Sequence, residues 1–240
     1  MMALYTHDQV PVREHRPSVS VSLLSTVARR RALIPRLHAA GIAGHVLLLQ
    51  SDREDVPPPP GTRVLPPVRG PLLLDTRGMS AVMQARVLDE LVTHHPTVPT
   101  LLLTLPTDRR LHRLAPSCSA VYAVVSDDVA ATDLALWLRH PGVVGRARHP
   151  QVLPAYVGIP APPRPLVDPR LLSLLVALAQ APTIDRAAKL GVLPERSFYR
   201  KLAELRTALR LPSRLYRGRA SVLLQTILDA LAVVPEREVG

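Results

Sequence analysis

Residues 183–209 read TIDRAAKLGVLPERSFYRKLAELRTAL and contain a short helical segment, a turn with Gly191 and Pro194, and a longer basic helical segment. Ala187 and Gly191 stand four residues apart. A small residue at the first position lets a second helix cross closely above it, and glycine at the second accepts the backbone of a turn. This spacing predicts a helix-turn-helix.

The second segment divides into an apolar face and a polar face. The residues expected in the core are Leu190, Val192, Phe198, Leu202 and Leu205. We expect this second segment to act as a recognition helix. The residues expected to contact DNA are Thr183, Arg196, Ser197, Tyr199, Arg200, Lys201, Glu204 and Arg206. Arginine can bind guanine O6 and N7 in bidentate fashion. A solvated helix face is the alternative, and Tyr199 could contact a phosphate or close the core edge.

Charge is unevenly distributed along the chain. The formal net charge is +11, from 30 basic and 19 acidic residues, and only Lys189 and Lys201 of the basic ones are lysines. Residues 1–140 contain 15 basic and 12 acidic side chains, whereas residues 141–240 contain 15 and 7. An arginine-rich composition can reflect a GC-rich genome, but a local excess favours a polyanionic partner such as nucleic acid.

Composition excludes several classes of protein. The 240 residues suffice for two modest domains, and with 47% apolar but 3% aromatic residues their cores must be aliphatic. The one cysteine, Cys118, excludes an internal disulfide framework and fits a reducing cytosol. No membrane-spanning run or signal peptide is present, so we expect a cytoplasmic protein. Without motifs for metal, phosphate or nucleophile chemistry, we expect no metal, no cofactor and no enzyme.

The N-terminal half alternates short apolar runs with helical patterns. The predicted strands are 18–24, 45–50, 71–75, 100–104 and 119–125, and the predicted helices are 28–40, 80–94, 109–114 and 128–139. Unalternating apolar strands between helices are typical of a parallel sheet that is covered on both faces. The sequence therefore predicts a five-stranded, flavodoxin-like α/β domain, with an extended proline-rich loop at 51–70.

Five segments follow from these patterns. They are a flexible arm (1–17), the α/β domain (18–140), a proline-rich linker (141–167), an all-α four-helix domain (168–234) and a tail (235–240). The last helix, expected near 219–233, is apolar over much of its circumference. A small domain cannot bury all of that surface, so part of it is expected to pair with a second copy. The residues assigned to this dimer interface are Leu223, Leu224, Ile227, Leu228 and Leu231.

This domain order resembles the LuxR-type (NarL/FixJ) transcriptional regulators. Their pattern, roughly E-I-A-x-x-L-G, a short turn and E-R-T-V-K-x-H-L, corresponds to DRAAKLG at 185–191 and ERSFYRKL at 195–202. The turn here is one residue longer, and Tyr199 replaces the usual lysine. The resemblance implies a homodimer with the third C-terminal helix in the major groove, the last helix at the dimer interface and half-sites about one helical turn apart.

The α/β domain resembles a receiver domain that has lost part of its chemistry. Asp75 and Thr104 fall at the phosphoacceptor and hydroxyl positions, although Asp75 could simply close a buried strand. Ser25 and Thr26 replace the acidic pair that would hold Mg²⁺, which prefers hard oxygen ligands. Val125 or Ser126 replaces the lysine, so phosphorylation of Asp75 lacks its electrostatic support. The resemblance therefore implies a degenerate receiver-like domain, with a small-molecule or protein ligand as its remaining input.

Three functions remain open at this point, the third being a ligand-responsive sensor whose output is not DNA. The first is a sequence-specific, phosphorylation-independent, homodimeric regulator that binds double-stranded DNA. The alternative is a basic adaptor that docks on another regulator or on transcription machinery and does not read DNA alone. Salt separates the first two, because DNA affinity falls by roughly 0.9 log units per log unit of salt for each phosphate contacted.

Overall fold

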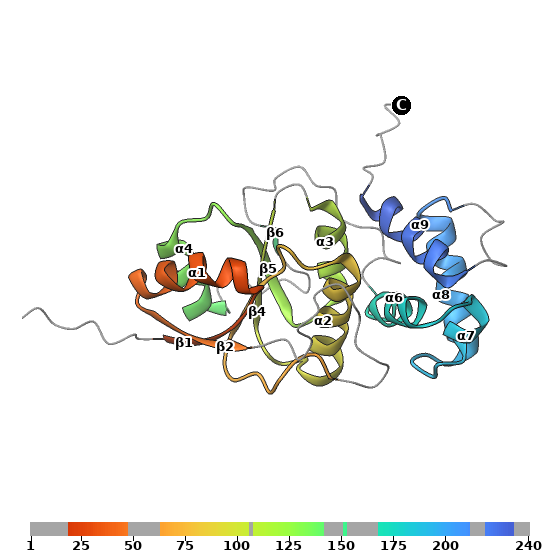
Figure 1. Cartoon of the computed structure of the whole chain (residues 1–240), viewed down its shortest axis with the longest axis horizontal. Coiled ribbons are helices and arrows are strands. Elements are labelled where there is room, and N and C mark those ends of the chain that lie inside the picture. Colours follow the sequence, from red (N-terminus) through yellow and green to blue (C-terminus); the bar gives the residue numbers. More distant parts are fainter. Residues whose placement is uncertain are drawn as a thin grey trace, which may run out of the picture.

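The computed structural model describes residues 19–47, 63–105, 108–141, 151–152, 168–211 and 219–232. They form a parallel sheet with helices on both faces, followed by a cluster of four helices (Figure 1). The expected arm, the tail and most of the proline loop and of the linker lie outside these residues. No helix in the described ranges combines the length and apolarity needed to cross a membrane.

The sheet has the order β2-β1-β3-β4-β5-β6, and every described pairing is parallel. The strands are β1 (Val19–Leu24), β2 (Ile42–Leu47), β3 (Leu72–Asp75), β4 (Thr100–Thr104), β5 (Val121–Ser126) and β6 (Gln151–Val152). The first five give the flavodoxin-like order 2-1-3-4-5, which confirms the predicted fold. Two details are corrected: β2 begins at Ile42 rather than His45, and a sixth strand lies within the predicted linker.

Alternate residues of the buried strands point to opposite faces of the sheet, as the strand period requires. Leu23, Leu73 and Leu101 pack with α1 (Val27–Ala39) and α4 (Ala131–Arg139). On the other face, Leu24, Leu74 and Leu102 pack with α2 (Ala81–His94) and α3 (Arg109–Leu114). A 3-10 turn, η1 (Ala115–Ser117), follows α3. Both faces are therefore covered, as the unalternating apolar strands predict.

The helical domain consists of α6 (Arg170–Gln180), α7 (Ile184–Ala188), α8 (Glu195–Ala208) and α9 (Ala220–Ala232). It packs on the helix layer of the α/β unit, with α6 against α2 and α9 against α3 (Figure 1). Ser173 Oγ donates to Asp89 Oδ1 at 2.7 Å, and Arg113 Nη1 donates to the Ala230 carbonyl at 3.1 Å. One apolar core runs from the sheet through α2 and α6 to α9.

This packing covers the residues assigned to the dimer interface, and the interface itself stays a prediction. The five α9 residues assigned to it, Leu223, Leu224, Ile227, Leu228 and Leu231, are all buried within one chain, with exposures of 0–7%. The sequence shows that α9 has more apolar surface than a four-helix domain can bury. It does not show that α6 and α3 of the same chain cover that surface. In this arrangement none of the five is exposed to a second copy.

Candidate nucleic-acid interface

The helix-turn-helix begins with a capped helix and a glycine turn. Thr183 Oγ1 accepts the backbone N–H of Arg186 at 3.3 Å, which satisfies one of the unpaired donors at the start of α7. Ala187 is buried, and Gly191 has a φ of +74°, a conformation that strains residues with a side chain. The two roles that the Ala187–Gly191 spacing implies are both present. Thr183 thus caps a helix, and a contact of Thr183 with DNA stays a prediction.

Three predicted core residues of α8, Phe198, Leu202 and Leu205, are buried at 0–1% exposure. Leu190 and Val192 are not: their exposures are 38% and 40%, so their assignment to the core is wrong. Both belong to the turn between α7 and α8, and they lie beside a pocket that faces α2 rather than under α8.

The outer face of α8, defined by Arg196, Tyr199, Arg200, Ala203 and Thr207, is exposed. Arg196 and Arg200 stand one helical turn apart and project from the same side. Arg200 Nε lies 4.0 Å from Glu204 Oε1, a solvent-exposed pair that holds the guanidinium weakly. Because α6 and α9 make the contacts with the α/β unit, that unit leaves this face accessible.

The other predicted contact residues of α8 border this face. Ser197 is half-buried, and Glu204 and Arg206 are exposed. The acidic Glu204 cannot donate to a phosphate, and its described partners are Arg200 and Lys201. The two arginines at the first turns of α8 therefore supply the donors best placed for a polyanion.

Lys201 does not point outward, contrary to the prediction. Its side chain is 2% exposed, and Nζ lies 3.0 Å from Asp168 Oδ2 and 3.5 Å from Glu204 Oε2. A buried ammonium needs such partners. Partial burial raises the pKa of Asp168, but the Arg170 backbone N–H and Lys201 outweigh this effect and lower it overall. Lys201 thus joins α8 to the start of α6 and is not available to DNA.

Tyr199 connects α8 to α7. Its hydroxyl donates to Asp185 Oδ1 at 2.8 Å, and its ring meets Phe198 edge to face at a centroid distance of 5.6 Å. The hydrogen bond to Asp185 is the largest of the effects that raise the pKa of Tyr199. Of the two roles considered for this residue, the geometry favours closing the core edge.

The predicted phosphoacceptor position belongs to an ion network that the sequence analysis does not predict. Asp75 is fully buried, and its two oxygens accept Arg77 Nε at 2.7 Å and Arg77 Nη2 at 2.6 Å. Arg77 Nη1 reaches Asp127 Oδ2 at 2.7 Å. The hydrogen bond to Asp75 is the main reason that the pKa of Arg77 is raised. The signal was an arginine two residues after the aspartate that closes β3.

This network occupies the carboxylate that would have to accept a phosphoryl group. Both Asp75 oxygens are engaged by a bidentate guanidinium, whereas an acceptor needs an accessible oxygen. Ser25 and Thr26 at the end of β1 are buried hydroxyls rather than carboxylates, and Thr104 is buried at the end of β4. Among the described residues, no group of three or more His, Cys, Asp or Glu side chains is arranged to hold a metal ion. Burial raises the pKa of Cys118 to about 11, which suits a core residue rather than a nucleophile.

Two solved structures are similar to this chain over most of its length. One is described as two RcsB dimers bound to two parallel DNAs. It is 11% identical, with a TM-score of 0.39, and the match covers 90% of this chain and 98% of that one. The other is full-length FixJ from B. japonicum, 15% identical, with a TM-score of 0.38 and the same coverage. At these TM-scores the likeness assigns no function to this chain. No protein-family model and no curated protein matches the sequence.

Proposed function

We propose that this chain is a DNA-binding transcription regulator in which α8 enters the major groove. The observation that carries the proposal is the outer face of α8: Arg196 and Arg200 are exposed one turn apart, above a closed core, and are not covered by the α/β unit. Guanidinium groups at the start of a recognition helix can bind both phosphates and guanine edges. The helix-turn-helix geometry supports the same proposal.

We further propose that the regulator acts without phosphorylation and as a homodimer on DNA. The first part is supported by the Asp75–Arg77–Asp127 network, in which Arg77 pairs with the carboxylate that would otherwise accept a phosphoryl group. The second part follows from the symmetry that helix-turn-helix regulators share with their operators. Since the five α9 leucine and isoleucine side chains are buried, the contact between copies must use other residues or a different placement of α9.

Selection of genomic DNA fragments with the full-length protein tests the proposal. We expect enrichment of one motif, an inverted repeat if the protein binds as a dimer. The variant Arg196→Ala/Arg200→Ala should lose that enrichment, because each arginine supplies about 1–3 kcal/mol of base or phosphate binding. The matched control is Arg29→Ala/Arg31→Ala, which removes the same charge from exposed positions on α1. Loss of enrichment in both variants would indicate nonspecific attraction and contradict the proposal.

The salt dependence of binding separates this function from the adaptor alternative. For a DNA reader, the plot of log affinity against log salt should be steep, and the double α8 variant should reduce its slope by roughly 1.8. An adaptor should enrich no DNA motif. Its affinity for a protein partner, bound through apolar surface, should depend only weakly on salt. That pair of results, obtained with folded protein, would replace the DNA proposal with the adaptor.

A further inference from the structure

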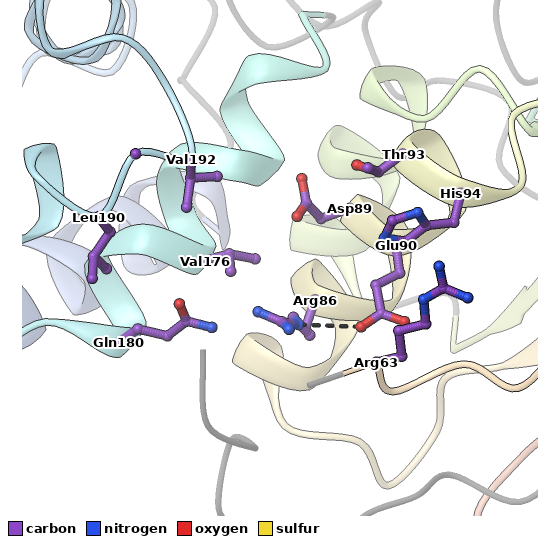
Figure 2. Close-up of a pocket in the computed structure, with 11 residues that line it drawn as sticks. Arg63, Arg86, Asp89, Glu90, Thr93, His94, Val176, Gln180, Leu190 and Val192 are labelled. Atoms are coloured by element: carbon purple, nitrogen blue, oxygen red, sulfur yellow. Dashed lines mark ion pairs between the residues drawn. The ribbon is translucent and has the colours of Figure 1, made fainter. Parts of the chain in front are cut away.

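A pocket of about 350 Å³ lies between the α/β unit and the helical domain (Figure 2). One side is α2 together with Arg63, which precedes β3. The other side is α6 and the turn 190–192, which leads into α8. Pockets of this volume accommodate small organic molecules. This one is lined jointly by both parts of the chain.

The acidic side chains of the α2 side are already engaged. The Glu90 carboxylate accepts the backbone N–H groups of Val64 and Leu65 at 2.7 and 2.8 Å, and Arg86 Nε lies 3.4 Å from it. Asp89 accepts the Ser173 hydroxyl, and burial raises its pKa. Glu90 is therefore satisfied within the chain, and Asp89 is held by one hydrogen bond from α6.

Arg63 is an exposed cation on this side, which also carries the Thr93 hydroxyl and the His94 ring. Within the described parts of the chain Arg63 makes no hydrogen bond or ion pair. In Figure 2, Arg63, Arg86 and His94 lie on the α2 side of the pocket, together with Asp89, Glu90 and Thr93. A guanidinium with an available planar edge is suited to a carboxylate, which it can bind through two parallel hydrogen bonds.

The opposite side carries aliphatic side chains beside the Gln180 amide, and it is partly uncovered. Leu190 and Val192 are 38% and 40% exposed, and Val176 of α6 lies between them and α2 (Figure 2). Two exposed aliphatic side chains that border a pocket gain free energy when an apolar ligand removes their surface from water. The pocket thus offers the Arg63 guanidinium on one side and aliphatic side chains on the other to one ligand.

We propose that this pocket binds a small organic anion with an aliphatic body, of the medium-chain carboxylate class. The carboxylate lies on Arg63, and the aliphatic body lies on Leu190 and Val192. Since the turn 190–192 leads into α8, the bound ligand ties the recognition helix to α2 and changes the affinity for DNA. This last step rests on the proposed function, whereas binding itself does not.

Ligand binding is tested first without DNA, on the full-length protein. The probe is anilinonaphthalene sulfonate, an amphipathic anion whose fluorescence reports an apolar site, and octanoate is the competitor. Octanol and octylammonium carry the same chain without the negative charge. We expect octanoate to displace the probe with an affinity at least about tenfold higher than that of either control.

Variants then assign the binding to this pocket. Arg63→Gln should weaken octanoate binding by about tenfold, and Val192→Ser by about threefold to fivefold, because they remove the charge and part of the apolar side. Both side chains are exposed, so the fold should be retained. The matched control, Arg29→Gln on α1, should bind as the unchanged protein does. Equal displacement by octanol, or equal binding by Arg63→Gln and Arg29→Gln, would overturn the proposal.

The coupling to α8 is tested by measuring DNA affinity with and without saturating octanoate. We expect a change of about fivefold or more that is absent in Arg63→Gln. Octanoate binding with unchanged DNA affinity would overturn the coupling. A protein that binds octanoate but no DNA under any condition would overturn the proposed function and leave the pocket assignment intact.

Discussion

At the carboxyl edge of the sheet, Arg77 is buried between Asp75 and Asp127, whereas Arg196 and Arg200 stand exposed on the outer face of α8. The same side chain neutralises internal carboxylates in one region and faces solvent in the other. A guanidinium that already has two close carboxylate partners has few donors left for a ligand. Those carboxylates, in turn, are poorly placed to bind a metal or to accept a phosphoryl group. The guanidinium groups that can still reach a ligand are therefore those on the outer face of α8.

The largest expected effect comes from breaking the buried network. Arg77→Met leaves the fully buried Asp75 without a countercharge, so the free energy of unfolding should fall by about 3–5 kcal/mol. Urea denaturation measures it. The double variant Asp75→Leu/Arg77→Met should recover most of the loss, because no uncompensated charge is buried. A single variant within about 1 kcal/mol of the parent would show that the network does not neutralise this site.

The second prediction concerns the buried cation of α8. Asp168→Ala removes the nearer partner of Lys201 and should cost about 1–3 kcal/mol, with Glu204 at 3.5 Å limiting the loss. The pKa of Asp168 is lowered from 3.8 in the fold, so its contribution is present above that value. The difference between variant and parent should persist down to about pH 4 and shrink in more acidic solution. Denaturation across this range measures it, and a difference that grows on acidification would contradict the ion pair.

A smaller effect on stability is expected at Tyr199. Unlike its arginine neighbours, this residue should not affect DNA binding. Tyr199→Phe removes the hydroxyl donor to Asp185 and should lower the free energy of unfolding by about 0.5–1 kcal/mol. The enriched DNA motif and the salt slope should remain unchanged. Denaturation and binding assays on the same preparation test both statements. Loss of DNA binding comparable to that of the Arg196→Ala/Arg200→Ala variant would assign this hydroxyl to the DNA contact.

The last prediction is the absence of an effect. Incubation with acetyl phosphate and Mg²⁺ should leave no adduct of about 80 Da, the mass of a phosphoryl group, on the intact protein. The cause is the bidentate hold of Arg77 on both Asp75 oxygens. Mass spectrometry of the parent and of Asp75→Asn provides the comparison. An adduct present in the parent and missing in the variant would restore Asp75 as a phosphoacceptor.

Local pattern predicted the elements of this fold well. The runs LLLD and TLLLT became β3 and β4, because continuous apolar residues between helices have one stable arrangement in a parallel sheet. β6 was missed because two residues, Gln151 and Val152, carry no periodicity and gain their place only by pairing with β5. The start of β2 was misplaced because Ile42 and Ala43 continue directly from the glycine turn.

The candidate site was predictable only where it depends on local sequence. The glycine turn and the exposed arginines follow from helical spacing. The burial of Lys201 does not, because its partner Asp168 lies 33 residues away along the chain. Leu190 and Val192 are apolar and were therefore assigned to a core, although contact between α2 and the helical domain places them beside a pocket. Such contacts depend on how distant segments pack, which helical spacing alone does not contain.

The apolar core shared by α2, α6, α3 and α9 also sets how this protein can be taken apart. A fragment starting at Asp168 would expose the leucines that now lie against α2 and α3, and it would self-associate or precipitate rather than serve as a transferable DNA-binding module. A chimaera that grafts this helical domain onto another sensor would therefore need to carry the matching surface of α2 and α3. In this architecture, the α/β unit and the helical domain would have to be transferred together.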